Sequence, residues 1–219
     1  MQKHPDITKA RIHRTLQRRI QPLAYPERKP IENLEAWAVG GEPVSYAEAA
    51  KQAFKPFEVG QKWGASWDTV WFRVKAEIPE EWAGKHVVAR ISLGGLGGEG
   101  FTAEGLVWQD GEPVCAINQN RKDVLLSPSA QAGETHEFLV EASANGLAAK
   151  RKGDPSESPN YDLPPAYTFE SADLAVYDQE GWKLWCEWNC LWEVLDALSD
   201  DTPRAGQLLS GMNEAVNLM

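Results

Sequence analysis

The sequence predicts a mainly β fold, an antiparallel β-sandwich that lies between a basic N-terminal helix and a C-terminal helical hairpin. Apolar and polar side chains alternate along residues 70–78, which is the two-residue period of a half-buried strand. Short strand candidates separated by Gly, Pro and Asn turns follow, with no helix between them, as in an antiparallel sandwich. At both ends of the chain the apolar period is that of a helix. We assign residues 1–34 to a helical arm and connector, residues 35–176 to the sandwich and residues 177–219 to the hairpin.

The N-terminal helix is expected over residues 6–21, with Asp6 or Thr8 as its cap and Pro22 at its end. The apolar side chains that recur every four residues are Ile12, Leu16 and Ile20. So narrow a stripe gives an isolated helix little stability, and we expect another surface to cover it. Residues 22–34, which contain three prolines, are expected to form an extended connector.

The remaining elements follow from local signals. Further strands are predicted over residues 86–93, 105–109, 113–118, 123–126 and 136–142. Asp110-Gly111 separates two of them and indicates a tight hairpin. Ser45 followed by Glu48 predicts a capping box at the start of a short helix over residues 45–54. Residues 146–166 are typical of a loop, and the pattern after them indicates helix to the end of the chain.

The C-terminal helices carry a wide apolar face. Asp178 is expected to cap the first helix, and Thr202 followed by Pro203 indicates the start of the second. The first helix exposes more indole surface than one short partner helix covers, so we expect an assembly surface here. Its expected interface residues, together with the N-terminal stripe, are Ile12, Leu16, Ile20, Trp185, Trp188 and Trp192.

Charge and composition exclude several classes of partner. The net charge of −10 divides into +6 on residues 1–30 and −16 on the rest. So acidic a body repels phosphates and argues against nucleic-acid binding, whereas the basic arm suits an acidic surface of the same chain or of a sister subunit. We find no apolar stretch of membrane-spanning length and no signal peptide. An odd count of three cysteines and the absence of glycosylation sequons favour the cytoplasm.

Candidate catalytic chemistry is sparse. The run Gly95–Gly100 matches a dinucleotide fingerprint, but a strand rather than a helix is predicted after it, so we interpret it as a glycine-rich loop. Cys186 and Cys190 share one helix face but lack further zinc ligands, which favours buried core thiols over a metal site. The paired carboxylates that acid–base chemistry could use lie at element ends or in loops, namely Glu80 and Glu81, Asp200 and Asp201, and Glu99 and Glu104. We therefore predict no catalytic and no metal-binding residue in this chain.

Ten tryptophans leave two interpretations open. Indole faces stack on pyranose rings, and Trp71 and Trp108 lie in predicted strands where a binding module would place a sugar platform. The same residues could instead fill the sandwich core or cover its contact with the helices, and we prefer this second interpretation.

Several motifs resemble one enzyme family. They are Trp63-Gly64, Trp67, Trp71-Phe72-Arg73-Val74 ending at Ile78-Pro79, residues 100–108, residues 110–114, residues 140–145 and residues 172–176. Together with the basic N-terminal helix and the Asp201-Thr202-Pro203-Arg204 segment, they resemble the N-terminal domain of bacterial and vacuolar-type α-mannosidases, glycoside hydrolase family 38. The resemblance implies a jelly-roll-like, galactose-binding-like sandwich.

The resemblance also implies a longer protein, in which a catalytic domain follows and holds zinc or another divalent metal through His and Asp residues for a retaining mechanism. The His-x-Asp run of this chain, His4-Pro5-Asp6, stands at its start and in the predicted basic arm, and the chain ends where that domain is expected to begin. The resemblance therefore implies a non-catalytic accessory and assembly domain, inactive alone and without a cofactor of its own. Its expected partners are the catalytic domain of the same polypeptide and further copies of the chain. The alternative is a stand-alone carbohydrate-binding module, although we expect sugar binding to be weak or absent.

Overall fold

The computed structural model describes residues 4–65, 67–95, 103–145 and 167–219. The chain forms two compact units, which are described separately. Residues 28–175 form a β-rich unit, and residues 1–27 together with 176–219 form a helical unit. The β-rich unit thus begins at residue 28 and not at residue 35, because the predicted connector already contributes strands to it.

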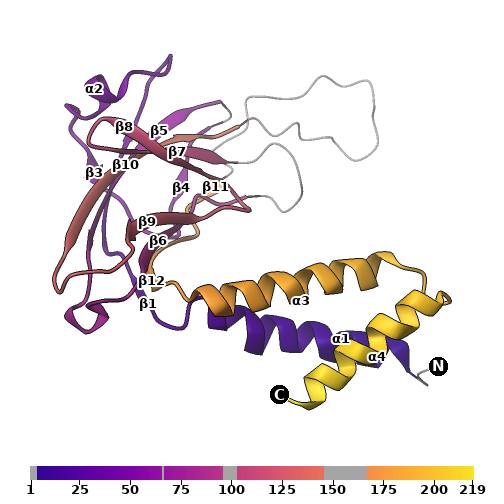
Figure 1. Cartoon of the computed structure of the whole chain (residues 1–219). Coiled ribbons are helices and arrows are strands. Elements are labelled where there is room, and N and C mark those ends of the chain that lie inside the picture. The colour runs from indigo at the N-terminus through magenta and orange to yellow at the C-terminus, as the bar shows by residue number, and fades with distance from the viewer. Residues whose placement is uncertain (1–3, 66, 96–102, 146–166) are drawn as a thin grey trace, which may run out of the picture. The chain divides into compact units, whose positions relative to one another are not determined.

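The β-rich unit consists of short strands, one short helix and one 3₁₀ turn (Figure 1). The strands are β1 (Arg28–Pro30), β2 (Asn33–Ala38), β3 (Lys55–Pro56), β4 (Lys62–Trp63), β5 (Thr69–Glu77), β6 (Val87–Ser92), β7 (Glu104–Gln109), β8 (Glu112–Ile117), β9 (Asp123–Ser127), β10 (Thr135–Ser143), β11 (Tyr167–Thr168) and β12 (Ser171–Val176). The helix is α2 (Tyr46–Ala49), and the 3₁₀ turn is η3 (Glu80–Trp82).

The strands build two main sheets. One has the order β1-β12-β6-β9, the other has the order β3-β2-β5-β10-β7-β8, and β11 pairs with β4 beside them. The pairs β5–β10, β10–β7, β2–β5, β7–β8, β6–β9 and β1–β12 are antiparallel. Together with the N-terminal helix and the C-terminal helices, this architecture confirms the predicted fold class.

The core between the sheets centres on β5. Phe72 is fully buried, and its ring lies 5.0–5.4 Å from the ring centroids of Phe57, Trp63 and Phe169. The Trp63 indole N–H donates to the Leu93 carbonyl at 2.8 Å, so this buried indole is hydrogen-bonded.

Two local predictions are confirmed by the backbone. Asp110 and Gly111 both have positive φ, at 53° and 89°, as a tight two-residue hairpin turn requires. Glu48 reaches back to the start of α2, where its carboxylate accepts from the Ser45 backbone N–H at 3.2 Å and from the Ser45 hydroxyl at 2.9 Å. The helix after this cap ends at Ala49, earlier than the predicted residue 54.

Several strands were not predicted. β1 lies within the connector predicted over residues 22–34, and β2 begins inside it. With three residues, β1 is too short for a recognisable pattern. β11 and β12 lie inside the range assigned to the sandwich, but the local pattern predicted no strand there. The glycine-rich run beyond Gly95 and residues 146–166 lie outside the described residues.

The helical unit contains α1 (Pro5–Thr15), the π-helical turn η1 (Leu16–Ile20), the 3₁₀ turn η2 (Gln21–Ala24), α3 (Gln179–Ala197) and α4 (Pro203–Asn217) (Figure 1). The predicted caps of α3 and α4 are confirmed: the Asp178 side chain accepts from the Gly181 N–H at 2.6 Å, and the Thr202 hydroxyl accepts from the Ala205 N–H at 3.2 Å.

The predicted ends of the first helix are wrong. His4 occupies the N-cap position without a side-chain bond, and Pro5 begins the helix, so neither Asp6 nor Thr8 caps it. Pro22 does not end the helical path either, because it lies in the first turn of η2. Backbone N–H groups in a first turn have no intrahelical acceptor, so proline, which has no N–H, is tolerated there.

Candidate functional site

The outer face of the six-stranded sheet carries a second apolar cluster, which we call the aromatic cluster. It forms where residues 39–54, which include α2 and which we call the covering segment, pack against the sheet. Its members are Trp37, Val39, Val44, Tyr46, Ala49, Ala50, Phe54, Trp71, Trp108 and Leu139. Trp71, whose side chain alternates with those of Val70 and Phe72 along β5, contacts this segment.

Both candidate sugar-platform residues lie in the aromatic cluster. The Trp71 side chain is 0% exposed, so neither face of its indole is open to a sugar ring. Trp108 is half-buried; its ring stacks on Tyr46 at 5.6 Å, and its Nε1 donates to Glu141 at 3.1 Å. The platform interpretation therefore does not hold for Trp71, and at Trp108 one ring face is already occupied.

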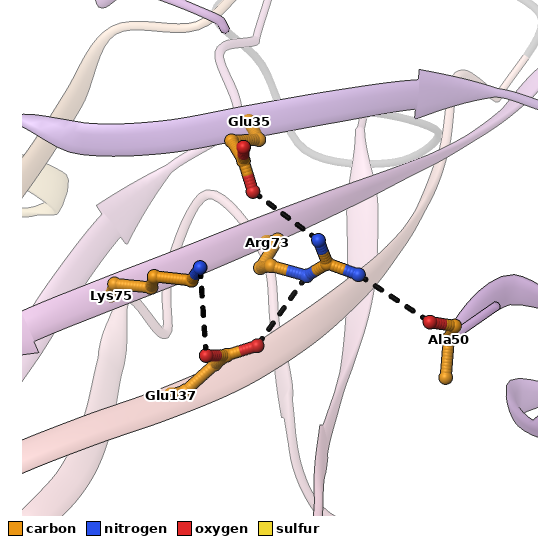
Figure 2. Close-up of polar contacts among 5 residues, drawn as sticks. All are labelled: Glu35, Ala50, Arg73, Lys75 and Glu137. Carbon is orange, nitrogen blue, oxygen red and sulfur yellow. Dashed lines mark hydrogen bonds and ion pairs between the residues drawn. The ribbon is translucent and has the colours of Figure 1, made fainter. Parts of the chain in front are cut away.

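An ion-pair network fixes the edge of this cluster (Figure 2). The Arg73 guanidinium projects from β5, with Nη1 3.3 Å from Glu35 on β2 and Nε 3.4 Å from Glu137 on β10. Its Nη2 donates to the Ala50 carbonyl at 3.4 Å, just after α2. The Arg73 Cζ atom lies 3.9 Å from the centroid of the Phe54 ring. One arginine thus ties three strands and the covering segment together.

Two hollows border this network. The smaller has a volume of about 180 Å³ and is lined by Tyr46, Arg73, Asp110 and Glu137 among others. The larger has a volume of about 520 Å³. Its ionisable lining residues are Glu32, Lys75, Glu77, His136 and Glu137. Glu137 lines both hollows, and its carboxylate also forms an ion pair with Lys75, whose Nζ lies 3.7 Å away.

Several ionisable side chains that line or border these hollows lie beside a group of opposite charge. His136 is largely buried, and its Nε2 lies 3.0 Å from Glu134. The Gln131 backbone N–H, which donates to Glu134 at 2.8 Å, is the main reason that the pKa of the Glu134 carboxyl lies below its usual value. Arg73, Lys75 and His136 each lie beside a carboxylate. Such an arrangement holds the sheet and its covering segment in place, because the charges of Arg73 and Lys75 already have anionic neighbours.

The helical unit accounts for the predicted interface residues. Ile12, Leu16 and Ile20 are at most 3% exposed. They pack in one core with Trp188 and Leu195 of α3 and with Ala205, Leu209, Met212 and Val216 of α4. The N-terminal stripe is therefore covered, as expected, but by the C-terminal helices of its own unit.

The tryptophans on the same face of α3 are also engaged inside the helical unit. Trp188 is only 7% exposed, and Trp185 and Trp192 pack partly buried against the same core. Trp192 stacks on His13 of α1 at a centroid distance of 4.7 Å. Within the helical unit, α1 and α4 thus pack against this face, and its contact with another domain or subunit stays a prediction.

Apolar side chains are exposed on the opposite face of α3 instead. Trp182 and Val194 are 37% and 45% exposed, whereas Leu191, three residues after Trp188 and four before Leu195, borders the buried face and is 43% exposed. Sequence reasoning missed this face, although one signal was present: Trp182, Cys186, Cys190 and Val194 recur every four residues. Cys190 is exposed and Cys186 is intermediate, so the two thiols are not the buried core thiols that we expected.

Other candidate chemistry does not gather into a site. In the described ranges, no three His, Cys, Asp or Glu side chains lie together as a metal ion would require. Glu80 and Glu81 are exposed at η3, and Asp200 and Asp201 are exposed in the link before α4. Glu99 lies outside the described residues. None of the described helices is long and apolar enough to cross a membrane.

The fold and its filled outer face define a jelly-roll domain joined to a helical unit. Residues 29–175 match the family model of the jelly roll domain of α-mannosidase, and this range agrees with the β-rich unit to within one residue at its start. The chain belongs to this α-mannosidase family.

The curated relatives that match this chain are named as α-mannosidases. α-Mannosidase 2C1 of human and of mouse are each 32% identical to this chain over 181 residues, which is 81% of this chain and 16% of the relative. α-Mannosidase G of Dictyostelium discoideum is 28% identical over 232 residues, covering 99% of this chain and 20% of the relative. The chain thus spans about a fifth or less of the length of these relatives.

Solved structures are less similar. A β-glucuronidase from Ruminococcus gnavus matches 70% of this chain and 29% of its own at 14% identity, with a TM-score of 0.45, which is too low to support an inference.

Proposed function

We propose that this chain is the non-catalytic N-terminal accessory and assembly part of a cytoplasmic, metal-dependent retaining α-mannosidase of glycoside hydrolase family 38. The observation that carries the proposal is the extent of the matches. The family model covers the jelly roll, and the Dictyostelium match extends over 99% of the chain, so it takes in the helical unit as well.

The structure of the jelly roll supports an architectural role. The outer face of its larger sheet is covered by residues of the same unit. The Arg73 guanidinium forms ion pairs with Glu35 and Glu137 and donates a hydrogen bond to the Ala50 carbonyl. Side chains paired in this way position backbone segments and are poorly suited to proton transfer.

The divalent metal of the proposed enzyme does not fit the described residues of this chain, since they contain no cluster of three ligands. We assign the metal to the rest of the longer polypeptide and derive no step through it here.

Zinc binding tests this part of the proposal. The purified chain, dialysed against zinc and then against buffer with a weak chelator, should retain no stoichiometric zinc. One tightly bound zinc ion per chain, lost in Cys186→Ser or Cys190→Ser, would contradict the assignment of the metal to another part of the enzyme.

A carbohydrate-binding module is the second candidate, and one observation favours it. Trp67 is 55% exposed and has a φ of 72°, a left-handed conformation that is unfavourable for a bulky side chain. Hydrogen bonds hold the backbone there: the Trp67 N–H donates to Ala144 at 2.7 Å, and the Ala65 N–H donates to the Asp68 carboxylate at 2.8 Å. An indole held outward in this way could stack on a pyranose ring.

Calorimetry with methyl α-mannoside separates the two candidates. An accessory domain should show no binding tighter than about 1 mM, which corresponds to about 4 kcal/mol. Tighter binding that is lost in Trp67→Ala, and kept in the matched helical-unit variant Trp182→Ala, would favour the binding module.

A further inference from the structure

Two cysteine thiols of α3 lie outside the core of the helical unit. Cys190 is exposed, Cys186 is of intermediate exposure, and both are free cysteines. The core side chains of α3, such as Trp188 and Leu195, belong to the cluster that includes residues of α1, η1 and α4, and neither cysteine is a member of it. The two thiols are therefore placed where a small ion from the solvent can reach them.

The helix itself sets the distance between these thiols. Residues four apart stand one turn from each other on the same face, with about 5–6 Å between their Cβ atoms. Cys186 and Cys190 lie well inside α3, which runs from Gln179 to Ala197. Each sulfur atom extends one bond beyond its Cβ, so both sulfur atoms can contact a single ion placed between them. The spacing thus presents two sulfur donors to one small ion.

The two thiols also interact electrostatically. Burial raises the pKa of the Cys186 thiol above its ordinary value of 9.0, and the neighbouring Cys190 raises it further. The second effect arises because two thiolates this close repel each other. A cation bound by both sulfur atoms removes that repulsion and favours the deprotonated pair.

The donors select the kind of ion. Thiolate sulfur is a soft ligand, which favours Cu(I) over hard ions such as Mg²⁺ and Ca²⁺. Structural zinc and iron–sulfur clusters take four protein ligands, and in the described part of the chain no third His, Cys, Asp or Glu side chain joins this pair. Cu(I) has a filled d shell and forms linear complexes with two thiolates. Two sulfur donors therefore satisfy this ion without a further ligand.

We propose that Cys186 and Cys190 bind one Cu(I) ion in a two-coordinate dithiolate site on α3. Each thiol releases its proton to the solvent as its sulfur–copper bond forms, so two protons are released and the copper remains Cu(I). The ion joins two successive turns of α3 and thereby stabilises the helix. The site is separate from the divalent metal assigned to the rest of the longer polypeptide, and it does not depend on the proposed function.

The sequence alone favoured the opposite conclusion. No metal-binding residue was predicted because both thiols were expected in the core and only zinc was considered as the metal. The structure places Cys190 at the surface and Cys186 partly so, which removes the first reason.

Competition for Cu(I) tests the stoichiometry of the site. The purified full chain, with its thiols reduced, is titrated without oxygen against the coloured complex of Cu(I) with bicinchoninate. The chain should withdraw one equivalent of copper, and its affinity should rise with pH because binding displaces two protons. A chain that withdraws no copper, or whose affinity is the same at every pH, would overturn the proposal.

Serine variants identify the donors. Cys186→Ser and Cys190→Ser should each lower the affinity for Cu(I) at least about tenfold, the lower end of what losing even a supporting residue costs at a metal site. The matched control is Cys115→Ser on β8, which removes a thiol from the jelly roll and should leave the affinity unchanged. Copper that is lost only in Cys115→Ser would contradict the assignment. Circular dichroism checks that each variant is folded.

The double variant Cys190→Ser/Val194→Cys tests the spacing. It keeps the number of thiols but places the two of α3 eight residues apart, which is about 12 Å along the helix axis. One Cu(I) ion cannot join two sulfur atoms so far apart, so the variant should bind as weakly as Cys190→Ser. Binding equal to that of the unaltered chain would show that the pair one turn apart is not the site.

X-ray absorption at the copper edge examines the coordination directly. Two sulfur donors and no third donor are expected around the ion. The copper-loaded chain should sediment with the same mass as the metal-free chain, because both donors belong to one chain. Copper held by three or more sulfur atoms, or copper that joins two chains, would overturn the proposal.

Discussion

Gly181, in the first turn of α3, lies directly against the carbonyl of Leu23 in η2: a Cβ added at Gly181 would stand 2.3 Å from that oxygen and 3.0 Å from the Ala24 nitrogen. Only glycine permits so close an approach of the two backbones. The approach is reinforced by the Asp178 N–H, which donates to the Ala24 carbonyl at 3.0 Å. The start of α3 is thereby fixed on the end of the N-terminal helical path.

Gly181→Ala should therefore destabilise the helical unit by about 1–3 kcal/mol, the range for forcing an extra methyl into a packed site. The matched control is Gly206→Ala in α4, where a Cβ would meet nothing within 4 Å. That change should stabilise the helix by up to about 1 kcal/mol, since alanine has the higher helix propensity. Urea unfolding followed by helical circular dichroism measures both, and equal effects of the same sign would refute the close-approach argument.

Arg73 is expected to be the main polar support of the covering segment in the jelly roll. Arg73→Met should cost about 1–3 kcal/mol, because Glu35 loses its partner in a partly buried position and the Phe54 ring loses the stacked guanidinium. Hydrogen exchange should then show faster opening around α2. Lys75→Met is the control: this lysine is 41% exposed, its ion pair is 3.7 Å long, and its loss should change stability by less than about 1 kcal/mol. If the two variants are equally stable, the network of Figure 2 does not support the segment.

Acid should weaken the jelly roll through Glu134. Its folded-state pKa lies below the ordinary 4.5, chiefly because the Gln131 N–H donates to the carboxylate and next because of the charge on His136. A carboxyl whose pKa is depressed by folding contributes stability that is complete above 4.5 and is lost as the pH falls through the folded-state value.

Glu134→Gln should therefore lower the melting temperature at neutral pH and reduce its fall below pH 4.5, as followed by thermal unfolding over a pH series. Glu112→Gln, which removes the charge of an exposed glutamate on β8, controls for net charge. A Glu134→Gln profile parallel to that of the unaltered protein would show that this carboxyl does not contribute to the acid response.

Local patterns predicted the strands whose alternation is strong. β5 carries a nine-residue run of alternating side chains, and the hairpin between β7 and β8 is specified by Asp110-Gly111, so both were found. β1 was missed because three residues ending in proline carry no period, and its identity as a strand depends on β12, which follows about 140 residues later.

The burial of Trp71 and of Ile12 shows a second limit of local patterns, which do not identify the distant residues that pack over a side chain. Alternation grouped Trp71 with the polar side chains of β5, but the pattern on this strand cannot reveal that residues near Tyr46 pack over that face. Likewise, the period of four identified the stripe of Ile12, whereas the covering residues, such as Met212, lie at the far end of the chain. What covers a surface is a tertiary property, which a local pattern does not reveal.

The measurement that tests the central claim most directly is hydrolysis of an aryl α-mannoside by the purified chain over a range of pH, with and without added zinc. Human α-mannosidase 2C1 assayed in parallel serves as the positive control. The account predicts no turnover above the rate without protein under any condition. Turnover that survives repurification and scales with the amount of this chain would contradict the claim that it is a non-catalytic part of an α-mannosidase.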